Sequence, residues 1–274
     1  MKLIFEAGST KTDVYVIGSG MDLVAEGINP AVQSDDRIRE ILLEVEKKLL
    51  DVAVEDIYYY GAGCATEELC EKIRMLLYGI WPCQNISVES DMTGAARGLL
   101  GKYPGIACIL GTGSNSALYD GKNVVRNVAP LGFILGDEGS GTAIGKRLLG
   151  DIFKGIAPAD IIELFISETG LDKNKVIEKV YRSESPNKFL ASNAKFVGRH
   201  IDHPYLKNIM GELLGLFLDR NVAQYAESKS EPIGFVGSIA WHFRDILEHE
   251  VKKRGWTLGR ILQKPMEGLV DYHS

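Results

Sequence analysis

The feature that most constrains the fold is a succession of expected strands and helices that occurs twice along the chain. The first copy opens with short apolar or alternating segments separated by glycine turns, and continues with segments of helical spacing that alternate with strands. Its expected strands lie at residues 2–6, 12–17, 23–28, 57–60 and 86–89, and its expected helices at 37–50 and 67–78. Strands followed by strand–helix alternation predict an α/β fold.

The second copy begins after a turn at residues 102–105. Its expected strands lie at 105–110, 114–119, 123–128 and 233–236, its helices at 139–153, 159–168, 173–181, 206–226 and 238–254, and one or two short helices within 258–272. This repetition predicts a duplicated α/β unit with domains at 1–104 and 105–274, and it leaves open that the last helix packs back on the first domain.

Composition narrows the function classes. The 274 residues include 37 acidic and 31 basic side chains, which argues against a nucleic acid or an anionic membrane as partner. No apolar run is long enough for a membrane span, and the first residues do not resemble a signal peptide. The four cysteines form no C-x-x-C pair and have no nearby histidine, so we expect no zinc site and a cytoplasmic protein with reduced thiols.

Two glycine turns occupy equivalent places in the two copies, within residues 6–13 and 110–116. Small residues let a ligand approach the backbone, whose amides can then bind phosphate oxygens. Glu6, at the end of the first strand, is suited to hold Mg²⁺ through water. Each turn taken alone is also compatible with an ordinary hairpin, but their equivalence favours a pair of phosphate-binding loops.

Residues 90–98 follow an expected strand and open a helix with small side chains. Asp91 has two interpretations. It is either the N-cap of this helix, for which aspartate is a preferred residue, or the acceptor of a proton from a substrate hydroxyl. The two roles are compatible, because capping needs only one carboxylate oxygen.

Glycines also surround two adjacent acids, Asp137 and Glu138, at the start of another expected helix. The glycines expose backbone donors, and a helix N-terminus favours an anion or polar hydroxyls, although an exposed entry turn would have the same composition. A similar segment at 234–240 joins a strand to a helix and is suited either to wrap a nucleoside or to form a plain turn.

These motifs occur in one order over nearly the whole chain. They are Glu6-x-Gly8-Ser9-Thr10-Lys11-Thr12, Gly27-Ile28-Asn29-Pro30, Ser90-Asp91, Gly111-Thr112-Gly113-Ser114-Asn115, Gly136-Asp137-Glu138-Gly139-Ser140 and Val236-Gly237-Ser238-Ile239-Ala240. The set resembles the BadF/BadG/BcrA/BcrD ATPase-type family, in its N-acetylglucosamine kinase-like branch. That family is part of the actin–hexokinase–Hsp70 superfamily, so the resemblance implies two RNase H-like domains with an interdomain cleft that closes over ATP.

The resemblance also implies a role for each matched residue. ATP and its phosphates would be bound by Gly8, Ser9, Thr10, Lys11, Gly111, Thr112, Gly113, Ser114, Gly237 and Ser238. Sugar hydroxyls and the N-acetyl group would be held by Asn29, Asn115, Gly132 and Asp137. Asp91 would be the catalytic base beside the 6-hydroxyl. Glu6 would hold Mg²⁺ through water, where many superfamily members have an aspartate.

The implied activity is ATP-dependent phosphorylation of the 6-hydroxyl of N-acetylglucosamine or a related amino sugar, with ATP and Mg²⁺ as cofactors. One alternative is an ATPase activator of a radical dehydratase, which would need cluster-ligating cysteines, yet no cysteine follows Cys108. Another is a non-catalytic sugar or nucleotide sensor, for which Asp91 would have no use. The acceptor among the amino sugars stays open, and a homodimer is expected only from related proteins.

Overall fold

The computed structural model describes residues 1–8, 10–49 and 53–274, and the chain divides into two compact units. The first unit consists of Met1–Tyr103, Asp120–Val124 and Lys264–Ser274, and the second of Pro104–Tyr119 and Val125–Gln263. The end of the chain therefore belongs to the first unit.

The first unit is built on a five-stranded sheet in the order β3-β2-β1-β4-β5. Its strands are β1 (Lys2–Ala7), β2 (Lys11–Ile17), β3 (Met21–Glu26), β4 (Asp56–Gly61) and β5 (Asn85–Ser90), and its helices are α1 (Asp35–Leu49), α2 (Glu67–Tyr78), α3 (Asp91–Leu100) and α13 (Met266–His273). Strands β1, β2 and β3 are antiparallel neighbours, whereas β1, β4 and β5 are parallel. The hairpin and the parallel strands thus share β1.

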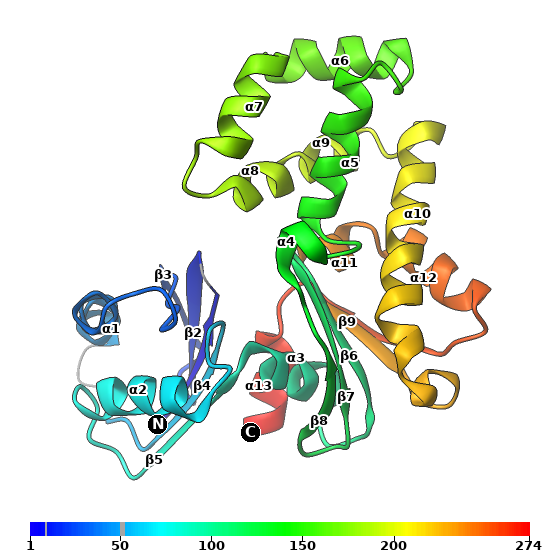
Figure 1. The fold of residues 1–274 in the computed structure, drawn as a ribbon. Coiled ribbons are helices and arrows are strands. Elements are labelled where there is room, and N and C mark those ends of the chain that lie inside the picture. The colour runs from blue at the N-terminus through cyan, green and yellow to red at the C-terminus, as the bar shows by residue number, and fades with distance from the viewer. Residues whose placement is uncertain (9, 50–52) are drawn as a thin grey trace. The chain divides into compact units, whose positions relative to one another are not determined.

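Alternation along β1 assigns the two faces of this sheet to different helices. Leu3 and Phe5 belong to a core that includes the buried residues of α1 and α2. Ile4 points to the opposite face, where it packs with Met266 and Leu269 of α13. Figure 1 shows α1 and α2 on one side of the sheet and α3 and α13 on the other.

Helices α3 and α13 approach each other closely because glycines meet where they touch. A Cβ placed at Gly268 would overlap the carbonyl of Gly98. The end of α13 is anchored as well, since His273 stacks on Tyr58 with ring centroids 3.6 Å apart and its Nε2 lies 2.7 Å from the hydroxyl of Tyr60. The C-terminal helix is therefore fixed to the first unit by packing and by polar contacts.

The second unit repeats the topology, with a five-stranded sheet in the order β10-β9-β6-β7-β8. Its strands are β6 (Gly105–Leu110), β7 (Ser114–Tyr119), β8 (Val124–Val128), β9 (Ile233–Val236) and β10 (Leu258–Leu262). Strands β6 and β7 are antiparallel, and β6, β9 and β10 are parallel. In each sheet the opening hairpin lies beside two further parallel strands, which confirms the duplicated α/β fold predicted from the sequence.

One large apolar core connects this second sheet to its helices. Buried residues of β6 and β9 pack with those of α5, α10 and α12. The helices are α4 (Gly132–Leu135), α5 (Gly141–Phe153), α6 (Ala159–Thr169), α7 (Lys173–Tyr181), α8 (Pro186–Ser192), α9 (Ala194–Arg199), α10 (Pro204–Arg220), α11 (Ser238–His242) and α12 (Arg244–Lys253), with 3-10 turns at Val222–Gln224 and Ala226–Lys229. No helix in the described part of the chain is long and apolar enough to cross a membrane.

The structure corrects several predicted elements. The segment Leu258–Leu262, expected to be helical, is strand β10. Parallel pairing with β9 decides its conformation, since Leu258 lies opposite Ile233 and Leu262 opposite Val236. The long helix expected over 238–254 is divided at Phe243 into α11 and α12, and helices α8 and α9 were not predicted.

Candidate functional site

The predicted site residues fall into two groups, one in each unit. The first unit contains Glu6, Gly8, Thr10, Lys11, Asn29 and Asp91, and the second contains Gly111, Thr112, Gly113, Ser114, Asn115, Gly132, Asp137, Gly237 and Ser238. Ser9, a predicted phosphate-binding residue, lies outside the described residues.

The first glycine turn connects β1 to β2. The last pair of this hairpin is Ala7 opposite Thr12, and the amide of Gly8 donates to the carbonyl of Lys11 at 2.9 Å. That amide therefore closes the turn. Thr10 and Lys11 are exposed, so their side chains are open to a ligand.

Three carboxylates interact in the first unit. Glu6 and Asp13 are opposite each other on β1 and β2, where side chains on neighbouring strands lie close together. The pKa of Glu6 is raised to about 7, mainly by burial and also by the Asp13 and Asp91 carboxylates, while Lys11 and Lys264 oppose the shift. Such a group attracts positive charge, because each carboxylate raises the cost of ionising its neighbour.

The structure assigns the cap of α3 to Ser90, so Asp91 as N-cap was wrong. The Ser90 hydroxyl accepts from the amide of Thr93 at 3.2 Å. Asp91 is the first residue of the helix, and its Oδ1 accepts from the Met92 amide at 2.8 Å. Burial raises the pKa of Asp91, and the hydrogen bond from Met92 opposes that rise. A half-buried carboxylate with a raised pKa is a stronger base than an exposed aspartate.

Asn29 lies in the connection after β3, against the loop that follows β4. The backbone amide of Asn29 donates to Oε1 of Gln33 at 2.7 Å, and the side-chain Oδ1 of Asn29 accepts from the backbone amide of Ala31 at 3.1 Å. A Cβ at Gly63, where φ is +84°, would overlap the Asn29 side chain. The Asn29 side chain is therefore held in place by its own loop and by the absence of a side chain at Gly63.

The second glycine turn rests on the first residues of α5. The amide of Gly111 donates to the carbonyl of Gly113 at 2.9 Å, which is the counterpart of the bond made by Gly8. The amides of Gly141 and Thr142 donate to the carbonyls of Gly111 and Thr112 at 2.8 and 3.1 Å. These two N-terminal amides of α5 support the turn, so they are not available to an anion or a hydroxyl.

Asp137 is tied to the same turn. It is the one non-glycine residue with positive φ in the described chain, at 59°, and its Oδ1 accepts from the Ser114 amide at 3.0 Å. Burial raises the pKa of Asp137, and the hydrogen bond from Ser114 opposes this effect. The neighbouring acid has another partner, since Glu138 forms an ion pair with Arg220 at 3.0 Å.

Gly237, between β9 and α11, lies directly on the backbone of the second turn. Its φ is +120°, and a Cβ there would overlap the carbonyl oxygen of Leu110. The start of α11 is thereby held against the backbone of Leu110 and Gly111. Ser238 begins α11 and is exposed.

The two remaining predicted residues of the second unit are Asn115 and Gly132. Oδ1 of Asn115, on β7, accepts from the amide of Ser116 and from Nδ2 of Asn127, both at 2.8 Å. Gly132 begins α4 with a φ of +72°, and its amide donates to the carbonyl of Pro130 at 2.6 Å.

Two residues of the first unit were not assigned a role by sequence reasoning. Asp13 is 1% exposed and accepts from Lys11 at 2.8 Å and from Lys264 at 3.1 Å. Asp13 stands at the end of a motif that the sequence did single out, whereas Lys264 is 251 residues away and carries no local signal.

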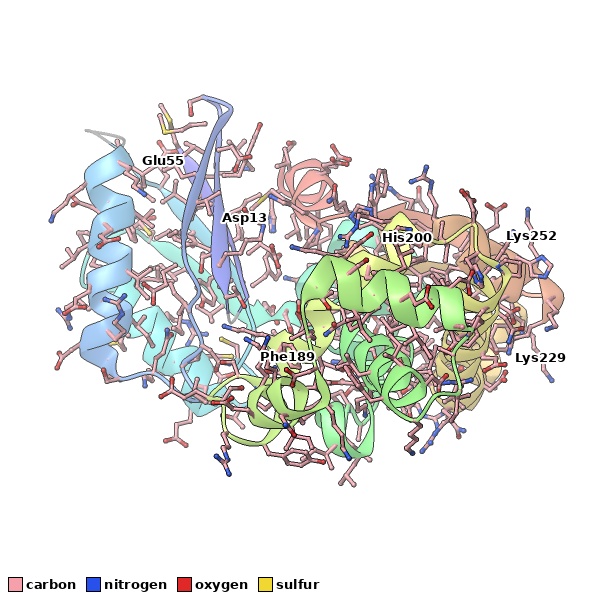
Figure 2. All side chains as sticks on the ribbon, turned by 90° about the horizontal axis from the view of Figure 1, so that it is seen from above. Asp13, Glu55, Phe189, His200, Lys229 and Lys252 are labelled. Carbon is pink, nitrogen blue, oxygen red and sulfur yellow. The ribbon has the colours of Figure 1, made fainter. Side chains whose placement is uncertain are left out.

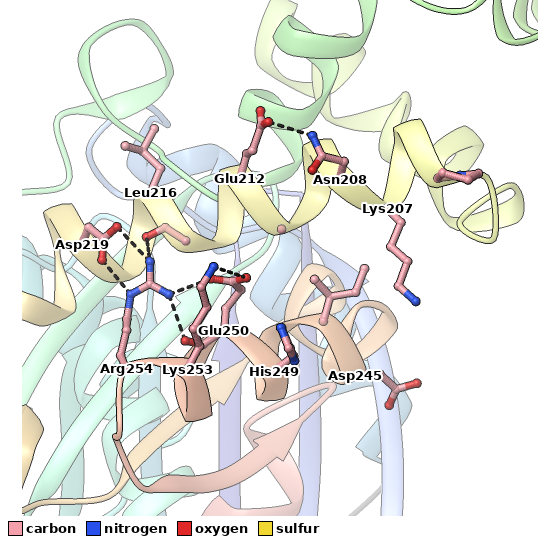
Figure 3. A pocket seen from close by; sticks show the side chains of 14 residues that line it. Lys207, Asn208, Glu212, Leu216, Asp219, Asp245, His249, Glu250, Lys253 and Arg254 are labelled. Carbon is pink, nitrogen blue, oxygen red and sulfur yellow. Dashed lines mark hydrogen bonds and ion pairs between the residues drawn. The ribbon is translucent and has the colours of Figure 1, made fainter.

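A groove of about 880 Å³ lies elsewhere in the second unit, between α10 and α12. In its wall, Arg254 forms ion pairs with Asp219 and Glu250 at 2.7 Å, as Figure 3 shows. None of the predicted site residues lines this groove. The pocket is therefore separate from the two glycine turns of the predicted site.

The carboxylates of the first unit are suited to a hydrated metal ion. No group of three or more His, Cys, Asp and Glu side chains in the described chain is arranged to hold a metal ion directly. The Glu6 carboxylate, on which the charges of Asp13 and Asp91 act, fits a hydrated Mg²⁺ better than an ion bound only by protein atoms, because Mg²⁺ usually keeps several waters.

Comparison with known proteins identifies a near relative. The crystal structure of a Porphyromonas gingivalis protein, provisionally named an N-acetylglucosamine kinase, is 44% identical, with a TM-score of 0.94 over 100% of this chain and 98% of that one. The chain belongs to the same family as that protein. No protein-family model matches the chain, and no curated protein matches it, so the BadF-type assignment stays a prediction.

More distant structures share the fold of this family. A Chromobacterium violaceum protein with the same provisional name is 17% identical, with a TM-score of 0.78 over 100% of this chain and 98% of that one. A ROK family glucokinase from Streptomyces griseus, in complex with glucose and AMPPNP, is 15% identical, with a TM-score of 0.53 over 99% and 97%. These likenesses confirm the α/β fold of actin–hexokinase type.

Proposed function

We propose that this protein is an ATP-dependent sugar kinase that phosphorylates the 6-hydroxyl of N-acetylglucosamine or a related amino sugar. The observation that carries the proposal is the 44% identity to the P. gingivalis protein over the whole chain. The half-buried Asp91 at the start of α3 supports it, because a kinase needs a carboxylate beside the acceptor hydroxyl.

The two glycine turns are proposed to bind the phosphates of ATP. The amides of Gly8 and Gly111 close their own turns, and the Ser114 amide donates to Asp137. We therefore assign phosphate binding to the exposed Thr10 and Thr112, the Lys11 ammonium, the Gly113 backbone and the Ser114 hydroxyl, with Ser9 as a further predicted contact.

The remaining predicted roles complete the proposal. Gly237 and Ser238 bind the adenosine, and the sugar is held by Asn29, Asn115, Gly132 and Asp137. For Asn115 the Oδ1 atom already accepts two hydrogen bonds, so its contribution to a sugar would be the donating amide group. Bound Mg²⁺, held by Glu6 through water, would neutralise charge on the triphosphate.

Asp91 is proposed to orient the acceptor hydroxyl and to take its proton. Phosphoryl transfer passes through a loose transition state, so most of the catalysis is positioning and charge stabilisation. The Met92 amide fixes one oxygen of Asp91, which leaves the other for the hydroxyl. The raised pKa of this carboxyl makes it a better proton acceptor.

The test is a coupled assay of ADP release with a panel of amino sugars, applied to the wild type and to Asp91→Asn. The substitution should lower turnover about 10²- to 10⁴-fold, the usual contribution of a general base. Folding should be preserved, because Ser90 caps the helix and an asparagine oxygen can still accept from Met92. Asp172→Asn, at the N-cap of α7, is the matched control and should keep full turnover, since both residues are good caps.

Two results would contradict the proposal. Near-native turnover of Asp91→Asn would show that Asp91 is not the catalytic base. Binding of ATP and sugar by the wild type without any ADP release would favour the sensor instead.

A further inference from the structure

We infer that Lys264 is a second phosphate-binding lysine beside Lys11, and that the buried Asp13 positions both ammonium groups. This inference rests on the proposed nucleotide-binding function. It concerns a residue from the far end of the chain that the glycine-turn motif does not contain.

The geometry places one carboxylate between two lysines. Nζ of Lys11 lies 2.8 Å from Oδ2 of Asp13, and Nζ of Lys264 lies 3.1 Å from Oδ1. Each oxygen of the carboxylate thus has its own cation. The side chain of Asp13, on β2 (Figure 2), is only 2% exposed, so it is enclosed by the protein and is itself unavailable to a ligand.

The lysines differ from Asp13 in exposure. The side chains of Lys11 and Lys264 are 50% and 45% exposed, which leaves their ammonium groups accessible. An ammonium has three donors, and one of them is directed at Asp13 in each lysine. Among these three side chains alone, the two ammonium groups outnumber the carboxylate by one charge, directly after the turn that contains Gly8 and Thr10.

The energetics favour a positioning role for Asp13. A buried charge is tolerated only when it is paired, and here two pairs offset its desolvation. Lysine is flexible, and fixing it on Asp13 removes freedom before an anion arrives. The same carboxylate faces Glu6 across β1 and β2, so the lysines also moderate the repulsion between these acids.

Lys264 lies at the point where the chain returns from the second unit to the first. Gln263 is the last residue of the second unit, and Lys264 is the first residue of the segment that rejoins the first unit. Its ion pair with Asp13 therefore attaches that segment to β2 at its first residue. A role confined to attachment would predict a loss of stability on substitution without any selectivity for phosphate.

The experiment measures the dissociation constants of adenosine, ADP and ATP, without sugar, by titration calorimetry of the full chain. In Lys264→Met, Asp13 keeps Lys11 as its partner, so no buried charge is left unpaired. We expect affinity for ADP and ATP to fall about tenfold to a hundredfold, the range for a hydrogen bond to a charged group, with adenosine unchanged. Lys264→Arg should restore part of the loss, and Lys47→Met, on the exposed side of α1, is the control of equal charge change.

The positioning role of Asp13 is tested by whether Asp13→Asn raises or lowers the affinity for ATP. If Asp13 acted only through its charge, Asp13→Asn would strengthen ATP binding, because a negative charge is removed. If it positions the lysines, the same variant should bind ATP more weakly while binding adenosine normally.

The outcomes separate the inference from the proposed function. If the wild type binds no nucleotide, both are wrong. If the wild type binds ATP but Lys264→Met binds all three ligands unchanged, or weakens all three equally, the role of Lys264 alone is overturned. Tighter ATP binding by Asp13→Asn would overturn the positioning role.

Discussion

Replacement of Gly237 by alanine should unfold the second unit at a markedly lower temperature. Gly237 has φ +120° and ψ 164°, a region open almost only to glycine, and forcing another residue there costs about 1–3 kcal/mol. The added Cβ would also lie 2.8 Å from the carbonyl carbon of Leu110 and 3.3 Å from the nitrogen of Gly111. Both neighbours are backbone atoms within the β6–β7 hairpin, so neither can rotate away.

The expected size follows from these two costs. Strain and overlap together should lower the free energy of unfolding by about 3 kcal/mol or more. For a domain of roughly 150–250 residues, each kcal/mol shifts the melting temperature by about 2–4 °C, so Gly237→Ala should melt at least about 6 °C below the wild type. Thermal unfolding followed by circular dichroism measures this shift.

Gly111→Ala is the matched control for this prediction. A Cβ at Gly111 would have no atom within 4 Å, and its φ is not in the positive range. This variant should therefore melt near the wild-type temperature. If the turn binds phosphate as proposed, the variant should also lose most of the stabilisation that added ATP gives, because the new methyl group would obstruct the phosphate. Equal melting of Gly237→Ala and wild type would refute the close packing of β9–α11 on the β6–β7 turn.

Two further predictions concern pH. Folding raises the pKa of Glu6 from 4.5 to about 7, so the stability that Glu6 contributes is complete below pH 4.5 and is lost as the pH rises through 7, by up to about 3 kcal/mol. Chemical denaturation between about pH 5 and pH 8 should therefore show a smaller decline in the free energy of unfolding for Glu6→Gln than for the wild type. The pKa of His273 is lowered from 6.5 to about 4, mainly by burial, so its contribution is complete above pH 6.5 and is lost as the pH falls through 4. His273→Gln should therefore lose less stability than the wild type between about pH 7 and pH 4, and an identical decline in both proteins would contradict the burial of the His273 side chain.

Local patterns in the sequence were sufficient for most of the fold. The helix over residues 67–78 and the strands over 105–110 and 114–119 have the predicted bounds. In these segments the hydrophobic period and the flanking turn residues agree, so local preference and tertiary packing favour the same structure.

The segment Leu258–Leu262 shows where local patterns are insufficient. Its spacing does not identify a strand, and the pairing with β9 stabilises the extended conformation. A parallel neighbour is contributed by residues far away in sequence, so no window of a few residues contains the information.

The candidate site shows the same division between local and distant information. Glycine turns and an aspartate after a strand are local patterns, and they identified Gly8, Gly111 and Asp91 as candidates. How each amide is used depends on its distant partner. The Gly141 and Thr142 amides donate to the second turn, about 30 residues earlier in the chain, and no local pattern indicates this pairing.

The duplication of the fold does not by itself predict which unit contains the end of the chain. Helix α13 follows β10 as α3 follows β5, so repetition alone would place α13 with the second sheet. It belongs to the first unit, where Met266 and Leu269 cover the face of β1 that carries Ile4. Because α13 crosses back in this way, the residue before it, Lys264, reaches Asp13 beside the first glycine turn. The return of the last helix to the first unit thus places a lysine near the end of the chain beside a motif at its beginning.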